Sequence, residues 1–84
     1  MAKKVTMYAT DWCGYCARAR RLLERKGIAF EEIDIEAVPG AYEEMRRRSG
    51  RTSVPQLFID EQSIGGAEEL QALEAEGRLD ALLQ

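Results

Sequence analysis

The sequence predicts an α/β fold in which a mixed four-stranded sheet is flanked by helices, with its elements in the order βαβ followed by ββα. Three patterns indicate this fold. Short strand-like runs alternate with amphipathic helical segments, the helical segments end at glycines, and a tight turn joins the last two strand-like runs. A βαβ unit gives two parallel strands with a right-handed crossover, and a hairpin adds antiparallel strands to the same sheet.

The first half of the chain alternates strand, helix and strand. Residues 3–10 contain β-branched residues followed by apolar and aromatic ones, which predicts a strand. Residues 13–26 place their apolar side chains on one helical face, and Gly27 supplies a left-handed stop, so we expect a helix there. Residues 29–35 are again strand-like, which completes the βαβ unit.

The second half begins with a helix and continues with a hairpin. A helix is expected to start at Pro39 and to end at Gly50. Residues 54–60 predict a strand entered through a proline, followed by a tight turn and a short strand at residues 63–64. Leucines at helical spacing predict a last helix over residues 67–76, before a final turn that ends the chain.

Composition limits the size, location and partners of the protein. The 84 residues are 45% hydrophobic and 32% charged, and this composition is even along the chain. It predicts a single domain over residues 1–84. A formal net charge of −3 gives no general electrostatic reason to bind nucleic acid. Neither a signal peptide nor an apolar run of membrane length is recognisable, so we expect a cytoplasmic protein that binds neither nucleic acid nor membranes.

The two cysteines, Cys13 and Cys16, lie directly after a predicted strand and at the start of a predicted helix. A Cys-x-x-Cys motif beside a βαβ pattern in a reducing compartment is typical of a redox site. Unpaired amide hydrogens at a helix start stabilise a thiolate, so Cys13 is the candidate nucleophile. Cys16 lies one turn further on the apolar side of the helix, which suits a resolving thiol.

Two structural interpretations of the cysteine pair carry less weight. A structural zinc site needs about four ligands, and this chain offers two cysteines and no histidine, so a closed site within one chain is excluded. A structural disulfide across so short a loop would restrict the unfolded chain little. The sequence therefore predicts no metal site in the monomer.

Together with the cysteine motif, three further features resemble the bacterial-type glutaredoxins. They are Tyr8, Thr-Ser-Val-Pro at residues 52–55 and Ile-Gly-Gly at residues 64–66, and the motif itself reads Cys-Gly-Tyr-Cys at residues 13–16. The resemblance spans essentially the whole chain. It implies a thioredoxin fold with a cis Pro55, and an enzyme that uses glutathione to reduce protein disulfides and glutathione mixed disulfides.

The resemblance also implies a binding site for glutathione. The backbone of Val54 would pair with the peptide backbone of glutathione, and the helix start after the glycine pair would receive its γ-glutamyl end. Arg51 would line the other side with Tyr15 and face the glycine carboxylate. The residues expected to contact glutathione are Tyr15, Arg51, Ser53, Val54, Pro55, Gly66, Ala67 and Glu68.

Three positions depart from the family pattern and leave alternatives open. Thr10 stands where many relatives carry lysine, Gly14 where proline is usual, and Glu68 where aspartate is more frequent. Relatives with a small residue at the Gly14 position resemble cluster-binding glutaredoxins, so one alternative is a dimer that holds a [2Fe-2S] cluster through Cys13 of each chain and two glutathiones. Another is a thioredoxin-like donor fed by a flavin reductase. The leading expectation is a monomer whose partners are glutathione and disulfide-bonded or glutathionylated proteins.

The sequence also predicts which side chains around the cysteine motif are buried and which are exposed. Tyr8 is expected in the core, and Trp12 is expected to be exposed beside Cys13 as a docking aromatic. The arginines of the first helix chiefly predict a solvated face. A second interpretation makes Arg18 and Arg21 part of a rim that attracts anionic glutathione or an acidic protein partner.

Overall fold

The computed structural model describes residues 3–84, and its elements follow the predicted order. The final turn expected after the last long helix is itself a short helix, α4. The bounds are β1 Val5–Ala9, α1 Gly14–Arg25, β2 Glu31–Asp34, α2 Ala41–Ser49, β3 Gln56–Ile59, β4 Gln62–Gly65, α3 Ala67–Ala75 and α4 Leu79–Leu82.

The strands form one mixed sheet in the order β2-β1-β3-β4. Strand β1 is central: it runs parallel to β2, with Thr6 opposite Glu31, and antiparallel to β3, with Val5 opposite Ile59. Strands β3 and β4 pair as an antiparallel hairpin. The predicted mixed four-stranded sheet is therefore confirmed. The end of β1 leads directly into the cysteine motif, at the carboxyl edge of a central strand.

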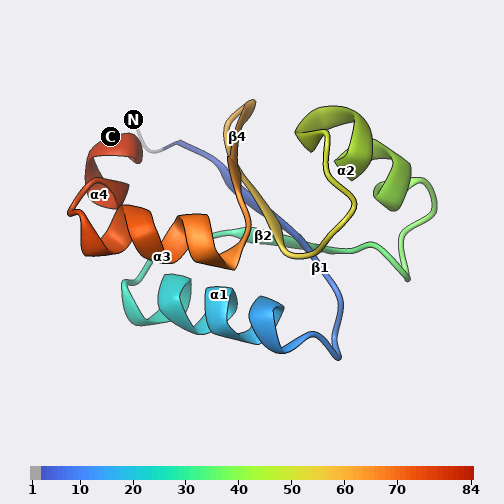
Figure 1. Ribbon diagram of the computed structural model, residues 1–84, viewed down its shortest axis with the longest axis horizontal. Coiled ribbons are helices and arrows are strands. Elements are labelled where there is room, and N and C mark those ends of the chain that lie inside the picture. Colours follow the sequence, from blue (N-terminus) through green and yellow to red (C-terminus); the bar gives the residue numbers. More distant parts are fainter. Residues whose placement is uncertain (1–2) are drawn as a thin grey trace.

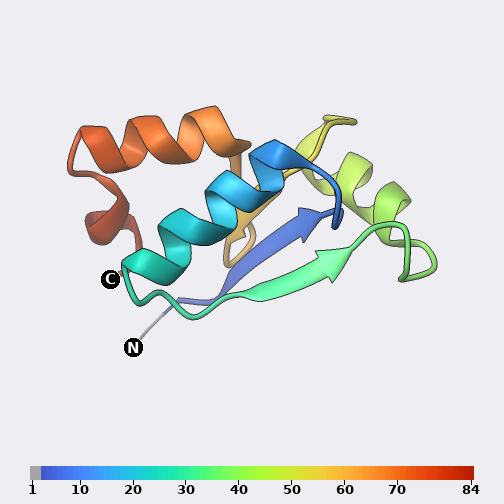
Figure 2. The same ribbon diagram turned by 90° about the horizontal axis from the view of Figure 1, so that it is seen from below.

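Helices cover both faces of the sheet. Helices α1 and α3 lie against one face and α2 against the other (Figure 1 and Figure 2). Because side chains alternate along a strand, Met7 packs with Leu23 and Leu70 on the first face, whereas Tyr8 packs with Met45 on the second. All five are buried. The expectation that Tyr8 belongs to the core is confirmed.

Helix α2 begins later than the sequence predicts. Pro39 was expected to be its start, but the first helical residue is Ala41. Gly40 precedes it with φ of 80°, a left-handed conformation that cannot continue a helix and that glycine adopts without strain. The Ala41 N–H donates to the carbonyl of Val38 at 3.1 Å. Pro39 therefore lies in the turn that connects β2 to α2.

Other bounds shift by a few residues. Cys13, expected to be the first helical residue, is instead the N-cap of α1, with an extended backbone (φ −84°, ψ 121°). Strand β2 covers only the middle of the predicted segment 29–35, and β4 extends one residue beyond residues 63–64 on each side. Within residues 3–84, the helices are too short or too polar to cross a membrane.

Candidate active site

Cys13 lies at the N-terminus of α1, where its thiol meets the free backbone amides of the helix. Its Sγ accepts a hydrogen bond from the Cys16 N–H at 3.4 Å, and its carbonyl accepts one from the Ala17 N–H at 3.1 Å. The Cys13 side chain is partly exposed and carries no disulfide. Both the amide hydrogen bond and the positive end of the helix stabilise a negative charge on this sulfur.

Cys16 occupies a different environment only one turn away. Its side chain is fully buried against the core of the α1 face. Burial, reinforced by the neighbouring Cys13, raises the pKa of the Cys16 thiol to about 11, against a smaller opposing effect of the Thr10 backbone. At neutral pH Cys16 is therefore a protonated thiol inside the protein, whereas Cys13 is the sulfur that faces solvent.

The loop before β3 brings Val54 and Pro55 to the nucleophile. The Val54–Pro55 peptide bond is cis, as the family resemblance implied. The Val54 carbonyl oxygen lies 3.7 Å from the Cys13 Sγ, and the protonated thiol donates to it. The backbone of the loop thus forms one wall beside the reactive sulfur.

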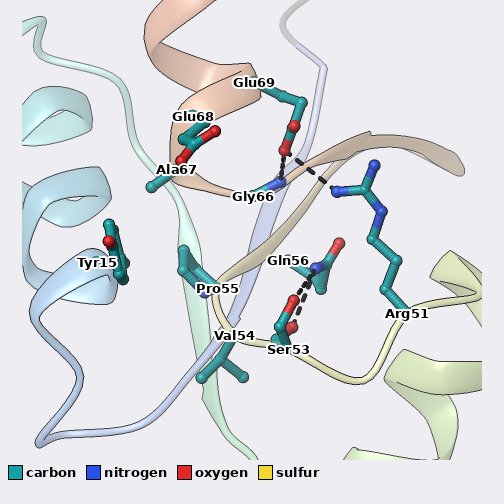
Figure 3. Close-up of a pocket in the computed structure, with 10 residues that line it drawn as sticks. All are labelled: Tyr15, Arg51, Ser53, Val54, Pro55, Gln56, Gly66, Ala67, Glu68 and Glu69. Carbon is teal, nitrogen blue, oxygen red and sulfur yellow. Dashed lines mark hydrogen bonds and ion pairs between the residues drawn. The ribbon is translucent and has the colours of Figure 1, made fainter.

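A pocket of about 320 Å³ opens next to this wall, between the start of α1, the start of α3 and the loop before β3. Figure 3 shows Tyr15 at one end of it and Arg51 at the other, with Pro55 and Gly66 between them. The structure brings together every residue expected to contact glutathione. The lining consists of Tyr15, Arg51, Ser53, Val54, Pro55, Gln56, Gly66, Ala67, Glu68 and Glu69.

Glu69 organises the α3 end of the pocket, and sequence reasoning missed it. Its carboxylate accepts hydrogen bonds from the Gly66 N–H at 2.7 Å and from Arg51 Nη1 at 3.2 Å (Figure 3). The Gly66 amide, followed by Arg51, holds the pKa of Glu69 below its usual value. The missed signal was its spacing: an acidic residue three positions after a helix N-cap is the pattern of a capping box.

The place of Arg51 corrects one expectation about the pocket. Arg51 was expected to share a side with Tyr15, but it lies at the opposite end, paired with Glu69 beside the start of α3. The reason is the ion pair itself, which draws the guanidinium toward the carboxylate that caps the helix. Arg51 and the first-turn amides of α3 therefore lie at one end of the pocket, where Glu69 already accepts from Arg51 and from the Gly66 amide.

Gln56 is the second lining residue that the sequence did not indicate. Its side chain is fully buried, and Nε2 donates to the Ser53 carbonyl at 3.0 Å. This contact holds the loop that carries Ser53 and Val54 against the sheet. Within residues 3–84, Gln56 Oε1 is a buried acceptor with no hydrogen-bond donor. A polar residue inside the apolar run 54–60 was the available signal.

The surface beside Cys13 exposes aromatic side chains. Trp12 is 73% exposed, as expected, and its indole Nε1 donates to Glu36 at 3.0 Å. Tyr15 is 54% exposed at the mouth of the pocket. An attacking thiol flanked by a pocket and by exposed aromatic groups is accessible to large as well as small disulfides.

A βαβ–ββα sheet with a Cys-x-x-Cys at the helix start after its central strand, and a cis-proline loop beside it, defines a thiol-disulfide oxidoreductase of the thioredoxin fold. Comparison with known proteins narrows this class. The glutaredoxin family model matches residues 5–64. The chain belongs to the glutaredoxin family.

Individual relatives agree with this assignment. Glutaredoxin 3 of Escherichia coli is 51% identical over 80 residues, covering 95% of this chain and 96% of the relative. The solution structure of a glutaredoxin from Brucella melitensis is 50% identical, with a TM-score of 0.84 over 98% of this chain and 89% of that one. A further solved structure, from work on metal binding of glutaredoxins, is also 50% identical, with a TM-score of 0.75 and the same coverage.

Proposed function

We propose that this glutaredoxin is a glutathione-dependent oxidoreductase that reduces protein disulfides and glutathione mixed disulfides. The observation that carries the proposal is the open pocket whose wall at Val54 lies 3.7 Å from the Cys13 sulfur. Its lining contains all the residues that the sequence predicts to contact glutathione.

The charges of the pocket suit the charges of glutathione. Glutathione carries two carboxylates and one ammonium. Arg51 and the free amides at the start of α3 provide a positive end for a carboxylate, as helix N-termini commonly do. Glu68 and Glu69 lie beside it and provide acceptors for the ammonium. The backbone of Val54 is left to pair with the peptide backbone of the ligand.

The first step in the proposed mechanism is attack by the Cys13 thiolate on the glutathione sulfur of a mixed disulfide. A bond forms between Cys13 and glutathione, the original disulfide bond breaks, and the substrate leaves as a thiolate that takes a proton from solvent. The backbone amides at the start of α1 hold the attacking charge. The pocket fixes which sulfur is attacked, because the glutathione half of the substrate lies in it.

The second step returns the enzyme to its starting state. The thiolate of a second glutathione attacks the glutathione sulfur bound to Cys13. Oxidised glutathione leaves, and Cys13 leaves as a thiolate, which the helix N-terminus stabilises. With a protein disulfide as substrate, Cys16 resolves the mixed disulfide instead and forms a Cys13–Cys16 disulfide, which glutathione then reduces.

The proposal is tested with a peptide that carries one glutathionylated cysteine. Turnover is measured as NADPH oxidation in the presence of glutathione and glutathione reductase, and in parallel with thioredoxin reductase replacing both. We expect activity only in the first system, loss of it in Cys13→Ser, and a substantial rate in Cys16→Ser. Full activity of Cys13→Ser, or activity driven by thioredoxin reductase alone, would contradict the proposal.

A second candidate function, carriage of a [2Fe-2S] cluster by a dimer, is favoured by the surface at Gly14. A Cβ built at this glycine meets no atom within 4 Å, so the space beside Cys13 is open to a second chain. Across residues 3–84, no three potential ligand side chains gather to hold a metal ion. As the family resemblance implies, Cys13 of each chain, with two glutathiones, would hold the cluster. Anaerobic reconstitution with iron, sulfide and glutathione tests this, and a colourless monomer would count against it.

For the leading function we propose a monomer that acts as one domain over residues 1–84 in the cytoplasm. Both described cysteines are free thiols, which suits a compartment where glutathione keeps thiols reduced. Sedimentation of the purified protein with and without glutathione tests the oligomeric state, and fractionation of the source cells tests the location.

A further inference from the structure

The outer face of α1 carries a row of arginines that have no ionic partner in the structure. Arg18, Arg21 and Arg25 are three and four positions apart, so they share one helical face, and all three are exposed. None of them takes part in an ion pair within residues 3–84. Arg20, on the adjacent face, differs: it pairs with Glu32 at 2.5 Å. We call the first three the arginine row.

The arginine row begins at the reactive cysteine. A shallow hollow beside the start of α1 is lined by Gly14, Tyr15, Arg18 and Arg21. The guanidinium of Arg18 lies over the Tyr15 ring, 5.7 Å from its centre. Since a helix rises about 1.5 Å per residue, Arg18 and Arg21 follow Cys13 along α1 by roughly 7 and 12 Å. The row thus leads away from the site of disulfide exchange without entering the pocket.

The row is a local feature and not part of a generally basic surface. The chain has a formal net charge of −3, and the first turn of α3, across the pocket, carries Glu68 and Glu69. A substrate that reaches Cys13 therefore meets unpaired arginines along the outer face of α1, whereas at the start of α3 the charge of Arg51 is paired with Glu69 and Glu68 adds a negative charge. The long phosphate backbone of a nucleic acid needs a more extended basic surface than this row offers.

We propose that the arginine row is a docking surface for an acidic segment of the protein substrate. The proposal rests on the function proposed above. An extended chain spans about 3.3 Å per residue, so acidic side chains two to four residues from the substrate cysteine reach Arg18 and Arg21 while that cysteine is at Cys13. Exposed charges of this kind raise the rate of productive encounter more than they raise affinity.

Two peptides test the proposal, each with one glutathionylated cysteine. One carries glutamate and aspartate two to four residues from the cysteine on both sides, and the other carries glutamine and asparagine there. The test variant is Arg18→Gln/Arg21→Gln. Its matched control is Arg46→Gln/Arg47→Gln on α2, which makes the same change in net charge on the opposite face of the sheet and also removes an arginine over a tyrosine ring, at 6.0 Å.

In the wild type at low salt we expect kcat/KM for the acidic peptide to exceed that for the neutral peptide by about tenfold. Arg18→Gln/Arg21→Gln should reduce this preference about fivefold, since each exposed charge contributes modestly. The kcat/KM for the neutral peptide should stay within about twofold of the wild-type value. The matched control should keep the preference. At about 0.5 M salt the preference should nearly vanish, because exposed charges are then screened.

Equal losses in the test variant and the matched control would mean steering by net charge and would overturn the proposal. A wild type that does not favour the acidic peptide would also overturn it. Failure to turn over either peptide refutes the proposed function instead. In that case, binding is measured by amide NMR with the acidic peptide carrying serine in place of cysteine. Shifts along α1 that the test variant loses support docking. No shifts, or shifts induced only by a single-stranded DNA oligonucleotide, overturn it.

Discussion

Replacing Glu69 by alanine should destabilise the protein by opening the start of α3. The carboxylate accepts from the Gly66 N–H at 2.7 Å and from Arg51 at 3.2 Å, so both donors lose their acceptor in Glu69→Ala. The N-cap residue, Gly66, has no side chain that could replace it. The change leaves the hydrophobic core intact, because the Glu69 side chain lies at the surface of the pocket.

The expected cost follows from the two contacts. Loss of a capping interaction costs about 1 kcal/mol, within a range of about 0.5–2. The ion pair with Arg51 adds at most a few tenths, because its side chains are 51% and 44% exposed. A total near 1.3 kcal/mol corresponds to a fall in Tm of roughly 5–10 °C for a domain of this size.

Thermal unfolding followed by circular dichroism measures this fall, with Glu68→Ala as the matched control. Glu68 is also a first-turn glutamate but is exposed, so its loss should cost less than about 0.5 kcal/mol. Glu69→Gln keeps an acceptor oxygen for the Gly66 amide and should lie between the two. Equal Tm values for Glu69→Ala and Glu68→Ala would refute the reasoning.

The pH dependence of the Glu69→Gln difference is a second measure of the same contact. The pKa of Glu69 is lowered in the folded protein, chiefly by the Gly66 amide, from an ordinary value near 4.5. A lowered pKa means that the charged carboxylate stabilises the fold above the ordinary value. This stability is lost as the pH falls through the folded-state pKa. The difference in stability between the wild type and Glu69→Gln should therefore shrink as the pH falls below the ordinary value and vanish below the folded-state pKa.

Three further outcomes follow from the structure. The rate at which Cys16 releases glutathione from the glutathionylated enzyme should rise about tenfold per pH unit between roughly pH 6 and 9, because burial raises the pKa of that thiol to about 11. Stopped-flow measurement of this release tests the prediction, and a rate that does not change with pH would contradict it. Gly65→Ala should cost about 2 kcal/mol in urea unfolding, because φ is 99° and the new Cβ would lie 2.7 Å from a neighbouring side chain. Gly77→Ala, with φ of 71° but open space, should cost only about half as much. Tyr8→Phe removes a buried hydroxyl that accepts from Arg48 at 2.8 Å and should lower Tm by roughly 5 °C, whereas an unchanged Tm would show that this hydrogen bond is dispensable.

The order of the elements could be predicted because each depends on neighbouring residues. The apolar face of α1, the glycine that ends it and the hairpin after β3 are all local patterns. The start of α2 could not be placed in this way. Proline is favoured at the first helical position because its ring fixes φ near the helical value, but Gly40 adopts a left-handed conformation that only the complete turn selects.

In the candidate site, too, local features could be predicted from the sequence, whereas contacts between distant residues could not. The inequality of Cys13 and Cys16 could be inferred from their positions on a predicted helix, and the structure gives it a physical basis in burial. The capping role of Glu69 is local, because its partner amide at Gly66 is three residues earlier, and the spacing alone indicates it. Its pairing with Arg51 could not be inferred, because Arg51 is 18 residues earlier and reaches the start of α3 only when the sheet and helices have assembled.

Trp12 gives the protein a built-in optical probe. It is the only tryptophan in the sequence, it is bonded to Cys13 through one peptide link, and its indole is both 73% exposed and held by Glu36 at 3.0 Å. Attachment of glutathione or of a substrate at Cys13 changes the polarity next to this ring. We expect the intrinsic fluorescence to report each change at the sulfur, so single turnovers can be followed without labels or coupled enzymes.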